Sequence, residues 1–206
     1  MPASSEPRFD LSGGALCLDF INTLEDRPRS VQEHLHVAGD LIAWGEQTKV
    51  VTASEAAQLR RWASRRPKDA AAALDDAKAL RESLFRVFHA ALEGRTPPAR
   101  DLARLNGVLA EGLAQLRVAV DGGGFGWRWE GRDAGLDVLK WAAARSAGDL
   151  LVSPERHDLR ECGSDVCSWL FLDRSRTKRR RWCNMRTCGN RAKARRFYER
   201  HRQAGN

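Results

Sequence analysis

Four cysteines near the C-terminus have the residue type and spacing of a metal site. Cys162 and Cys167 form one Cys-x4-Cys pair, and Cys183 and Cys188 form a second pair with the same gap, after fifteen intervening residues. Two equal pairs of thiolates joined by a short connector can close a tetrahedron around one zinc ion. Four thiolates also hold iron–sulfur clusters, but a small, strongly basic module favours zinc. We therefore expect one zinc ion per chain.

A site of this kind has a structural role. Four thiolates fill the tetrahedron and leave no open position for a water molecule, so the ion would hold the fold rather than catalyse hydrolysis. A module of about 50 residues has little core of its own and gains from a metal staple. In a reducing compartment, clustered cysteines are metal ligands more often than disulfides. Cys17 lies apart in an apolar run, and we expect it in the core.

Basic residues surround the cysteines. Residues 155–206 contain fifteen Lys/Arg and six Asp/Glu, a net charge of +9, whereas the whole chain carries +8. The excess of positive charge over a neutral body predicts an anionic partner for this segment, and nucleic acid, either DNA or RNA, is favoured over a merely solvated face. The predicted nucleic-acid-binding residues are Lys178, Arg179, Arg180, Arg181, Arg191, Lys193, Arg195 and Arg196.

The remaining sequence predicts a mainly α fold with a small β-hairpin. Apolar residues at helical spacing indicate helices near residues 16–24, 37–45, 68–93, 99–113 and 135–151, and Thr52 with Glu55 resembles a capping box at the start of a further helix. Alternating residues 116–120 and 125–129 flank a glycine-rich turn and predict the hairpin. Trp127 and Trp129 alternate along it, and we expect them to fill a core; stacking on nucleic-acid bases is the alternative.

We expect two domains, a helical domain over residues 1–153 and a zinc module over residues 154–206. In the module, residues 169–172 would form a strand paired with residues 180–182. Gly189 would take a positive φ, and Asn190 would cap a helix over residues 191–202, whose Phe197, Tyr198 and His201 would pack on the hairpin. A knuckle, a hairpin and a ligand pair leading into a helix are typical of a zinc ribbon or a treble clef.

These residues resemble a known family. Cys188-Gly189-Asn190-Arg191 is the motif that names the CGNR zinc finger, and residues 159–162, 169–173, 181–183 and 192–196 agree with its context. Residues 16–23 and 142–151 resemble the opening motif and closing helix of the ABATE domain that precedes this finger. The resemblance implies a bacterial, stress-linked transcription regulator with a zinc-binding, nucleic-acid-binding C-terminus.

Three polar residues interrupt the first apolar segment: Asp19, Asn22 and Thr23. If buried, they must find hydrogen-bond partners. We expect them to tie neighbouring helices together, and the alternative is that they line a pocket for a small-molecule effector that switches the finger.

Three function classes follow from these observations. A transcription regulator with a sensor-like helical domain is the leading hypothesis, and a zinc-stabilised adaptor whose basic face meets an acidic protein is the second. An enzyme is the weakest, because no nucleophile–base pair or phosphate loop is evident in the first domain. Residues 1–10 do not resemble a secretory signal, and no apolar stretch approaches the roughly 20 residues that span a bilayer, so we expect a cytoplasmic protein without membrane partners.

Overall fold

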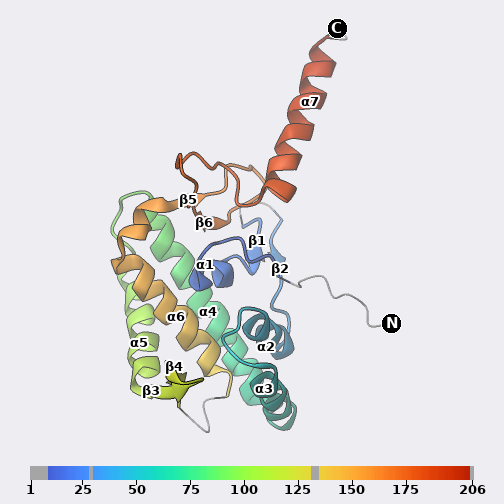
Figure 1. Cartoon of the computed structure of the whole chain (residues 1–206). Coiled ribbons are helices and arrows are strands. Elements are labelled where there is room, and N and C mark those ends of the chain that lie inside the picture. The colour runs from blue at the N-terminus through green and yellow to red at the C-terminus, as the bar shows by residue number, and fades with distance from the viewer. Residues whose placement is uncertain (1–8, 28–29, 131–134, 205–206) are drawn as a thin grey trace.

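Helices form most of the molecule, and one helix leaves the body at the C-terminal end (Figure 1). The computed structural model describes residues 9–27, 30–130 and 135–204. The expectation of a mainly α fold with small hairpins is confirmed. The helices are α1 (Leu16–Ile21), α2 (Ala38–Gln47), α3 (Ala53–Arg65), α4 (Pro67–Leu92), α5 (Ala99–Gln115), α6 (Asp137–Val152) and α7 (Asn190–Ala204), with a 3-10 turn η1 (Pro154–Asp158) and a π turn η2 (Met185–Gly189).

Local sequence signals set several helix ends. The hydroxyl of Thr52 accepts a hydrogen bond from the Glu55 backbone at 3.2 Å, and the Glu55 carboxylate accepts one from the Thr52 backbone at 2.7 Å, so the predicted capping box starts α3. Pro67 occupies the first position of α4, where its missing N–H costs no helical bond.

The main core is built around the short helix α1, which packs against α4 and α6. Four of its six residues are buried, and Phe20 meets the ring of Trp44 at 5.1 Å. Cys17 lies in this core as expected, where burial raises the pKa of its thiol to about 12. Cys17 is therefore an apolar core residue and not a metal ligand.

Three two-stranded antiparallel sheets complete the described part of the chain. They pair β1 (Leu24–Glu25) with β2 (Gln32–Glu33), β3 (Leu116–Asp121) with β4 (Gly124–Trp129), and β5 (Leu159–Glu161) with β6 (Leu170–Leu172). Among the described residues, no helix combines the length and the apolar character needed to cross a membrane.

The β3–β4 hairpin lies at the end of the body opposite α7 (Figure 1). Gly122 and Gly123 both have positive φ, as a two-residue hairpin turn requires. Trp129 is half-buried and packs on Trp141 with ring centroids 5.9 Å apart, so it covers the edge of the helical body and is not part of the core clusters. The expectation of a core position was also wrong for Trp127, which is 62% exposed because the hairpin extends beyond the helices that would cover it.

The predicted strand pairing of the C-terminal module was also wrong. β6 pairs with β5, which precedes the first cysteine, and not with residues 180–182. The outer edge of β6 is bonded to the helical domain instead: Leu172 donates its backbone N–H to Gly13 at 2.8 Å. Because Leu170 and Leu172 lie in the main core and Phe171 lies in the core of the cysteine module, β6 contributes to both.

Candidate metal centre and basic surface

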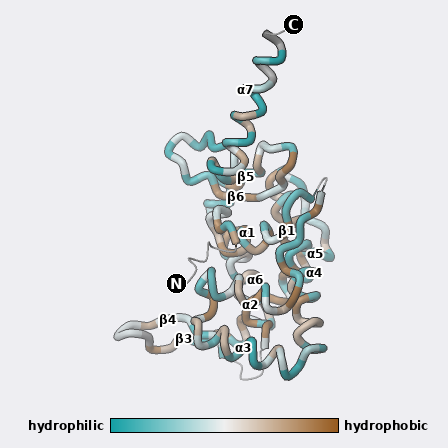
Figure 2. The backbone as a smooth tube through the Cα atoms, turned by 90° about the vertical axis from the view of Figure 1, so that its right-hand side faces the viewer, coloured by the Kyte–Doolittle hydropathy of each residue, from teal (hydrophilic) through white to brown (hydrophobic). Residues whose placement is uncertain are grey.

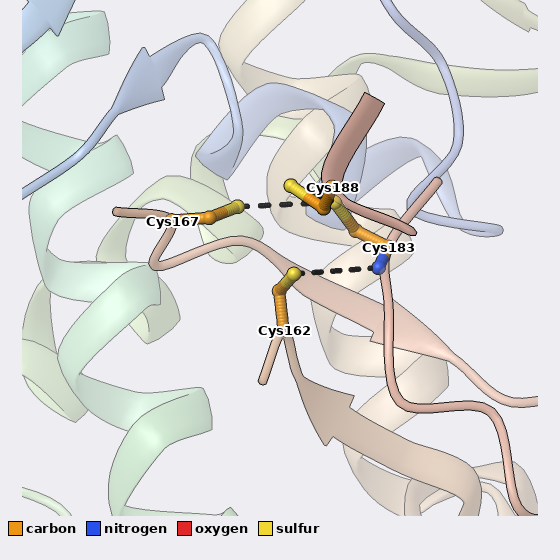
Figure 3. Close-up of side chains that lie close together, drawn as sticks. All are labelled: Cys162, Cys167, Cys183 and Cys188. Carbon is orange, nitrogen blue, oxygen red and sulfur yellow. Dashed lines mark hydrogen bonds between the residues drawn. The ribbon is translucent and has the colours of Figure 1, made fainter. Parts of the chain in front are cut away.

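The four cysteines converge from two tight turns, as Figure 3 shows. Cys162 follows β5, and a turn in which Cys167 donates its backbone N–H to Ser164 at 3.1 Å brings the second sulfur back. Cys183 lies two residues before the π turn that leads into α7, and Cys188 lies within that turn. The turn from Cys162 to Cys167, hereafter the knuckle, is held against the second pair because Gly163 donates its backbone N–H to the Arg181 carbonyl at 2.8 Å. One ligand pair on a knuckle and one at the start of a helix is the arrangement of a treble clef.

The sulfur distances fit a tetrahedral zinc ion. All four Sγ atoms lie within 4.8 Å of one another. Cys167 and Cys183 are separated by 3.8 Å between sulfurs, and Cys183 and Cys188 by 3.7 Å. A zinc–sulfur bond of about 2.3 Å in a regular tetrahedron gives a sulfur–sulfur edge of about 3.8 Å. The site therefore holds one zinc ion through Cys162, Cys167, Cys183 and Cys188, and its role is structural.

The four thiols share hydrogen bonds, and this sharing shifts their pKa values in opposite directions: it lowers the pKa of Cys162 and raises the pKa values of Cys167 and Cys183. Hydrogen bonds from the thiols of Cys167, Cys183 and Cys188, and then from the Cys183 backbone N–H, hold the pKa of Cys162 below its usual range. Trp169 and Phe171 are buried in one hydrophobic cluster with Cys162, Cys183 and Cys188.

Two backbone expectations near the last ligand were wrong. Gly189 is helical instead of taking a positive φ, and the atom nearest to a Cβ there would be the sulfur of Met185 at 2.7 Å, which belongs to a half-exposed side chain that can move aside. Asn190 is the first residue of α7, and its amide donates to the Arg186 carbonyl at 3.1 Å instead of capping the helix, because the π turn already continues into α7.

Three of the eight predicted nucleic-acid-binding residues are held by a carboxylate or by the segment of the second cysteine pair. Lys178 donates to the Asp158 carboxylate at 2.7 Å, and Arg195 is paired with Asp165 at 2.7 Å. Arg180 lies 4.5 Å from the Phe171 ring centroid and donates to the carbonyls of Trp182 and Cys183.

The other five predicted residues lie at the surface of the module. Arg179, Arg191 and Lys193 are exposed and have no carboxylate within ion-pair distance in the part of the chain that the structure describes. Arg181 lies over the ring of Trp182 at 5.4 Å, and Arg196 donates to the Ala192 carbonyl at 3.3 Å. The basic surface is hereafter Arg179, Arg181, Arg191, Lys193 and Arg196.

Asp173 organises the loop that carries this surface, and the sequence analysis missed it. It is fully buried and accepts backbone hydrogen bonds from Ser175 at 2.9 Å and Arg180 at 2.8 Å. Hydrogen bonds from Ser175, and then from Arg180, hold its pKa below the ordinary value. The Asp-x-Ser spacing of Asp173 and Ser175 is a turn signal that could have identified it.

Asp19, Asn22 and Thr23 all line a cavity of about 40 Å³, together with Phe9, Asp10, Glu25, His34 and Trp169. Asn22 and Thr23 also have strong internal bonds. The Asn22 amide donates to the Leu170 carbonyl at 2.9 Å and accepts from the Leu170 N–H at 3.1 Å. Thr23 accepts from Arg81, which is buried and forms a two-point ion pair with Glu33.

Asp19 is held close to the first residues of the helical domain. Its carboxylate accepts the Gly13 N–H at 2.8 Å. Burial, and to a smaller extent the charge of Asp10, raise the pKa of Asp19 to about 7. The cavity has room for about one water molecule, and a neighbouring hollow of about 180 Å³ shares Asp10, Glu25 and Trp169 with it and reaches Arg191.

The fold and the site define a zinc-stabilised protein in which a helical domain is fused to a basic treble-clef module. Comparison with protein families agrees: residues 14–154 match the ABATE model, described as "putative stress-induced transcription regulator", and residues 159–201 match the CGNR zinc finger. The chain belongs to the ABATE family and carries a CGNR zinc finger. No protein in a curated set matches the chain significantly.

Proposed function

We propose that the chain is a transcription regulator whose basic surface binds the phosphate backbone of nucleic acid. The observation that carries this proposal is the cluster of exposed cations on a rigid zinc scaffold. Arg179 lies on the loop before the second cysteine pair, and Arg191 and Lys193 lie on the first turn of α7, beside the metal site. Guanidinium and ammonium groups on a fixed support are suited to phosphate contacts.

A salt titration tests the proposal. Each phosphate contact on duplex DNA contributes about 0.9 to the slope of log affinity against log salt. The triple variant Arg179→Ala, Arg191→Ala and Lys193→Ala should bind every sequence more weakly and with a flatter slope. Its zinc content should equal that of the wild type, because no ligand is changed.

The matched control removes the same charge at the far end of the molecule. Arg61, Arg65 and Lys68 are exposed residues of α3 and α4, and replacing all three with alanine should leave affinity and slope close to wild type. If wild-type protein binds neither DNA nor RNA at low salt, the proposal fails, and an acidic protein partner becomes the explanation of the basic surface.

The second part of the proposal is that the helical domain senses an effector in the hollow of about 180 Å³ that adjoins the cavity at Asp19, because the cavity itself has room for about one water molecule. Asn22 lies one helical turn beyond Asp19 and holds β6 of the zinc module. An effector that displaced Asp19 would therefore act on the strand that positions the zinc module. Thermal-shift screening of small polar metabolites tests this, since a true effector should stabilise the wild type and lose its effect in Asp19→Asn; a stabilising ligand that acts equally on both variants would locate sensing elsewhere.

A further inference from the structure

Helix α7 stands away from the rest of the protein. Figures 1 and 2, which view the molecule from directions 90° apart, both show it projecting from the module. It packs chiefly against the π turn Met185–Gly189, and Ala192 is its buried contact. The expectation that Phe197 and Tyr198 pack on the β-hairpin was wrong, because they are 50% and 71% exposed.

The exposed aromatic residues form one stripe along α7. The rings of Phe197 and Tyr198 meet edge to face at 5.8 Å, and the Phe197 and His201 rings are 3.9 Å apart. At 100° per residue, these three side chains share one face of the helix. An exposed aromatic stripe on the part of α7 that lies beyond its contact with the π turn indicates a contact surface for a partner.

Basic side chains border the aromatic stripe on both sides. By the same helical geometry, Arg191 and Arg202 lie along one border and Lys193 and Arg196 along the other, and all four are exposed. A second copy of this helix would meet like charge, so self-association through α7 is disfavoured. The positive charge of the two borders is complementary to a polyanion whose negative groups lie along two parallel lines.

Duplex DNA has this geometry in its major groove. The groove is about 12 Å wide and admits an α-helix of about 10–12 Å diameter, with phosphates along both walls and base edges on the floor. A single strand offers one line of phosphates only. With fifteen residues, α7 is about 22 Å long, enough to lie along the groove.

We infer that α7 is the element that enters the major groove of duplex DNA, with Phe197 and Tyr198 against the base edges and the two basic borders against the phosphates of opposite strands. The apolar partner that the groove offers to an aromatic ring is the thymine methyl group. The inference rests on the proposed function and specifies it, because it names the nucleic acid, the groove and the contacting residues.

The experiment compares the double variant Phe197→Ala and Tyr198→Ala with the wild type on a duplex of mixed sequence and on the same duplex with thymine replaced by uracil. Wild type should lose affinity when the methyl groups are removed. The double variant should bind the thymine duplex about tenfold more weakly, respond little to uracil, and keep the wild-type salt slope. Alanine favours helix, and circular dichroism checks that α7 is intact.

A control variant removes exposed apolar side chains at the opposite end of the molecule. Val120→Ala with Phe125→Ala changes two residues that are 72% and 82% exposed on the β3–β4 hairpin, and it should bind like the wild type.

The outcomes separate this inference from the proposed function. If wild type binds duplex DNA but the α7 double variant matches it and uracil has no effect, the inference alone is overturned. Tighter binding to single strands or to RNA than to duplex DNA overturns it too, as does binding to anionic vesicles or to an acidic peptide in place of the duplex. If no nucleic acid is bound at all, the proposed function fails and the inference fails with it.

Discussion

At the scale of single residues, the neighbouring arginines Arg179 and Arg180 have different roles. Arg180 stacks on Phe171 and donates to the carbonyls of Trp182 and Cys183, whereas the side chain of Arg179 is exposed. An arginine that is fixed in this way contributes to packing and hydrogen bonding as well as charge. Charge alone therefore does not identify the residues of the module that are free for a partner.

The difference between Arg179 and Arg180 gives a direct prediction. Arg180→Ala should lower the free energy of unfolding by about 2 kcal/mol and speed zinc loss to a chelator, because the carbonyls of Trp182 and Cys183 lose their donor. Arg179→Ala should do neither and should instead weaken nucleic-acid binding. Urea unfolding and a zinc-release assay with a colorimetric chelator check both variants. Equal stability of the two variants would contradict the structural role of Arg180.

Asp19 gives a prediction with a pH dependence. Burial raises its pKa from 3.8 to about 7, so the folded protein binds this proton more tightly than the unfolded chain does. The stability that Asp19 contributes is therefore lost as the pH rises from about 4 to above 7. Asn keeps the oxygen that accepts the Gly13 N–H and carries no charge.

The unfolding temperature of Asp19→Asn should therefore equal that of the wild type near pH 4 and exceed it increasingly toward pH 8. Differential scanning calorimetry across this range measures the difference between the two proteins, which cancels the titration of groups that they share. A difference that stays constant with pH would show that Asp19 does not carry the shifted pKa.

At the scale of elements, β6 is held along both edges. β5 pairs with one edge, while Asn22 and Gly13 bond Leu170 and Leu172 on the other. A side-chain amide that both donates to and accepts from one backbone residue supplies the same two hydrogen bonds as a residue of a neighbouring β-strand. The small sheet is thereby attached to the helical domain.

Removing this amide should loosen the attachment. Asn22→Ala leaves the buried N–H and C=O of Leu170 without partners, so we expect a loss of about 3 kcal/mol in the free energy of unfolding and faster hydrogen exchange at Leu170. Asn106→Ala, at an exposed position of α5, is the matched control and should be neutral or slightly stabilising. An unchanged exchange rate at Leu170 in Asn22→Ala would show that the Asn22 amide does not hold β6 to the helical domain.

The sequence predicted the helices well, because their signals are local. The Thr52 capping box, the apolar stripe of α4 and the glycine turn after residue 121 all act within a few residues, and each was found where it was expected. The four ligands could be predicted for the same reason, since each Cys-x4-Cys pair closes within one turn.

The predictions that failed depended on contacts between distant residues. The pairing partner of β6 is β5, which lies on the other side of the knuckle in the sequence. The second edge of β6 contacts Asn22, which is 148 residues from Leu170. The exposure of Phe197 depends on the direction in which α7 leaves the π turn, which helical periodicity does not specify. The split of the arginines into structural and exposed ones likewise depends on tertiary partners, such as Phe171 for Arg180 and Asp165 for Arg195.

At the scale of the whole molecule, the zinc site and the helical core are mechanically connected. Zinc holds the knuckle and the second cysteine pair together, the knuckle follows β5, and Leu159, Leu170 and Leu172 of this sheet belong to the main core. Loss of the metal therefore removes support from residues that the helices need as well.

We expect metal removal to destabilise the helical domain in addition to residues 159–204, since metal binding and folding are coupled in such modules. Hydrogen exchange of the α1 amides should become faster after chelation and in Cys183→Ser. Cys17→Ala is the control for loss of a cysteine that is not a ligand, and it should retain one zinc ion per chain by elemental analysis. Unchanged protection of α1 in the metal-free protein would mean that the helical domain is independent of the metal.

The position of β6 between two cores also constrains how the protein can evolve. Adjacent side chains of one strand, Leu170 and Phe171, must fit partners encoded at opposite ends of the gene. Recombination at residue 154 would bring in a strand fitted to another helical domain, and the hybrid would carry mismatched packing from the start. The two parts should therefore diverge together among descendants of this gene, with changes at Asn22 or Gly13 accompanied by changes in β6.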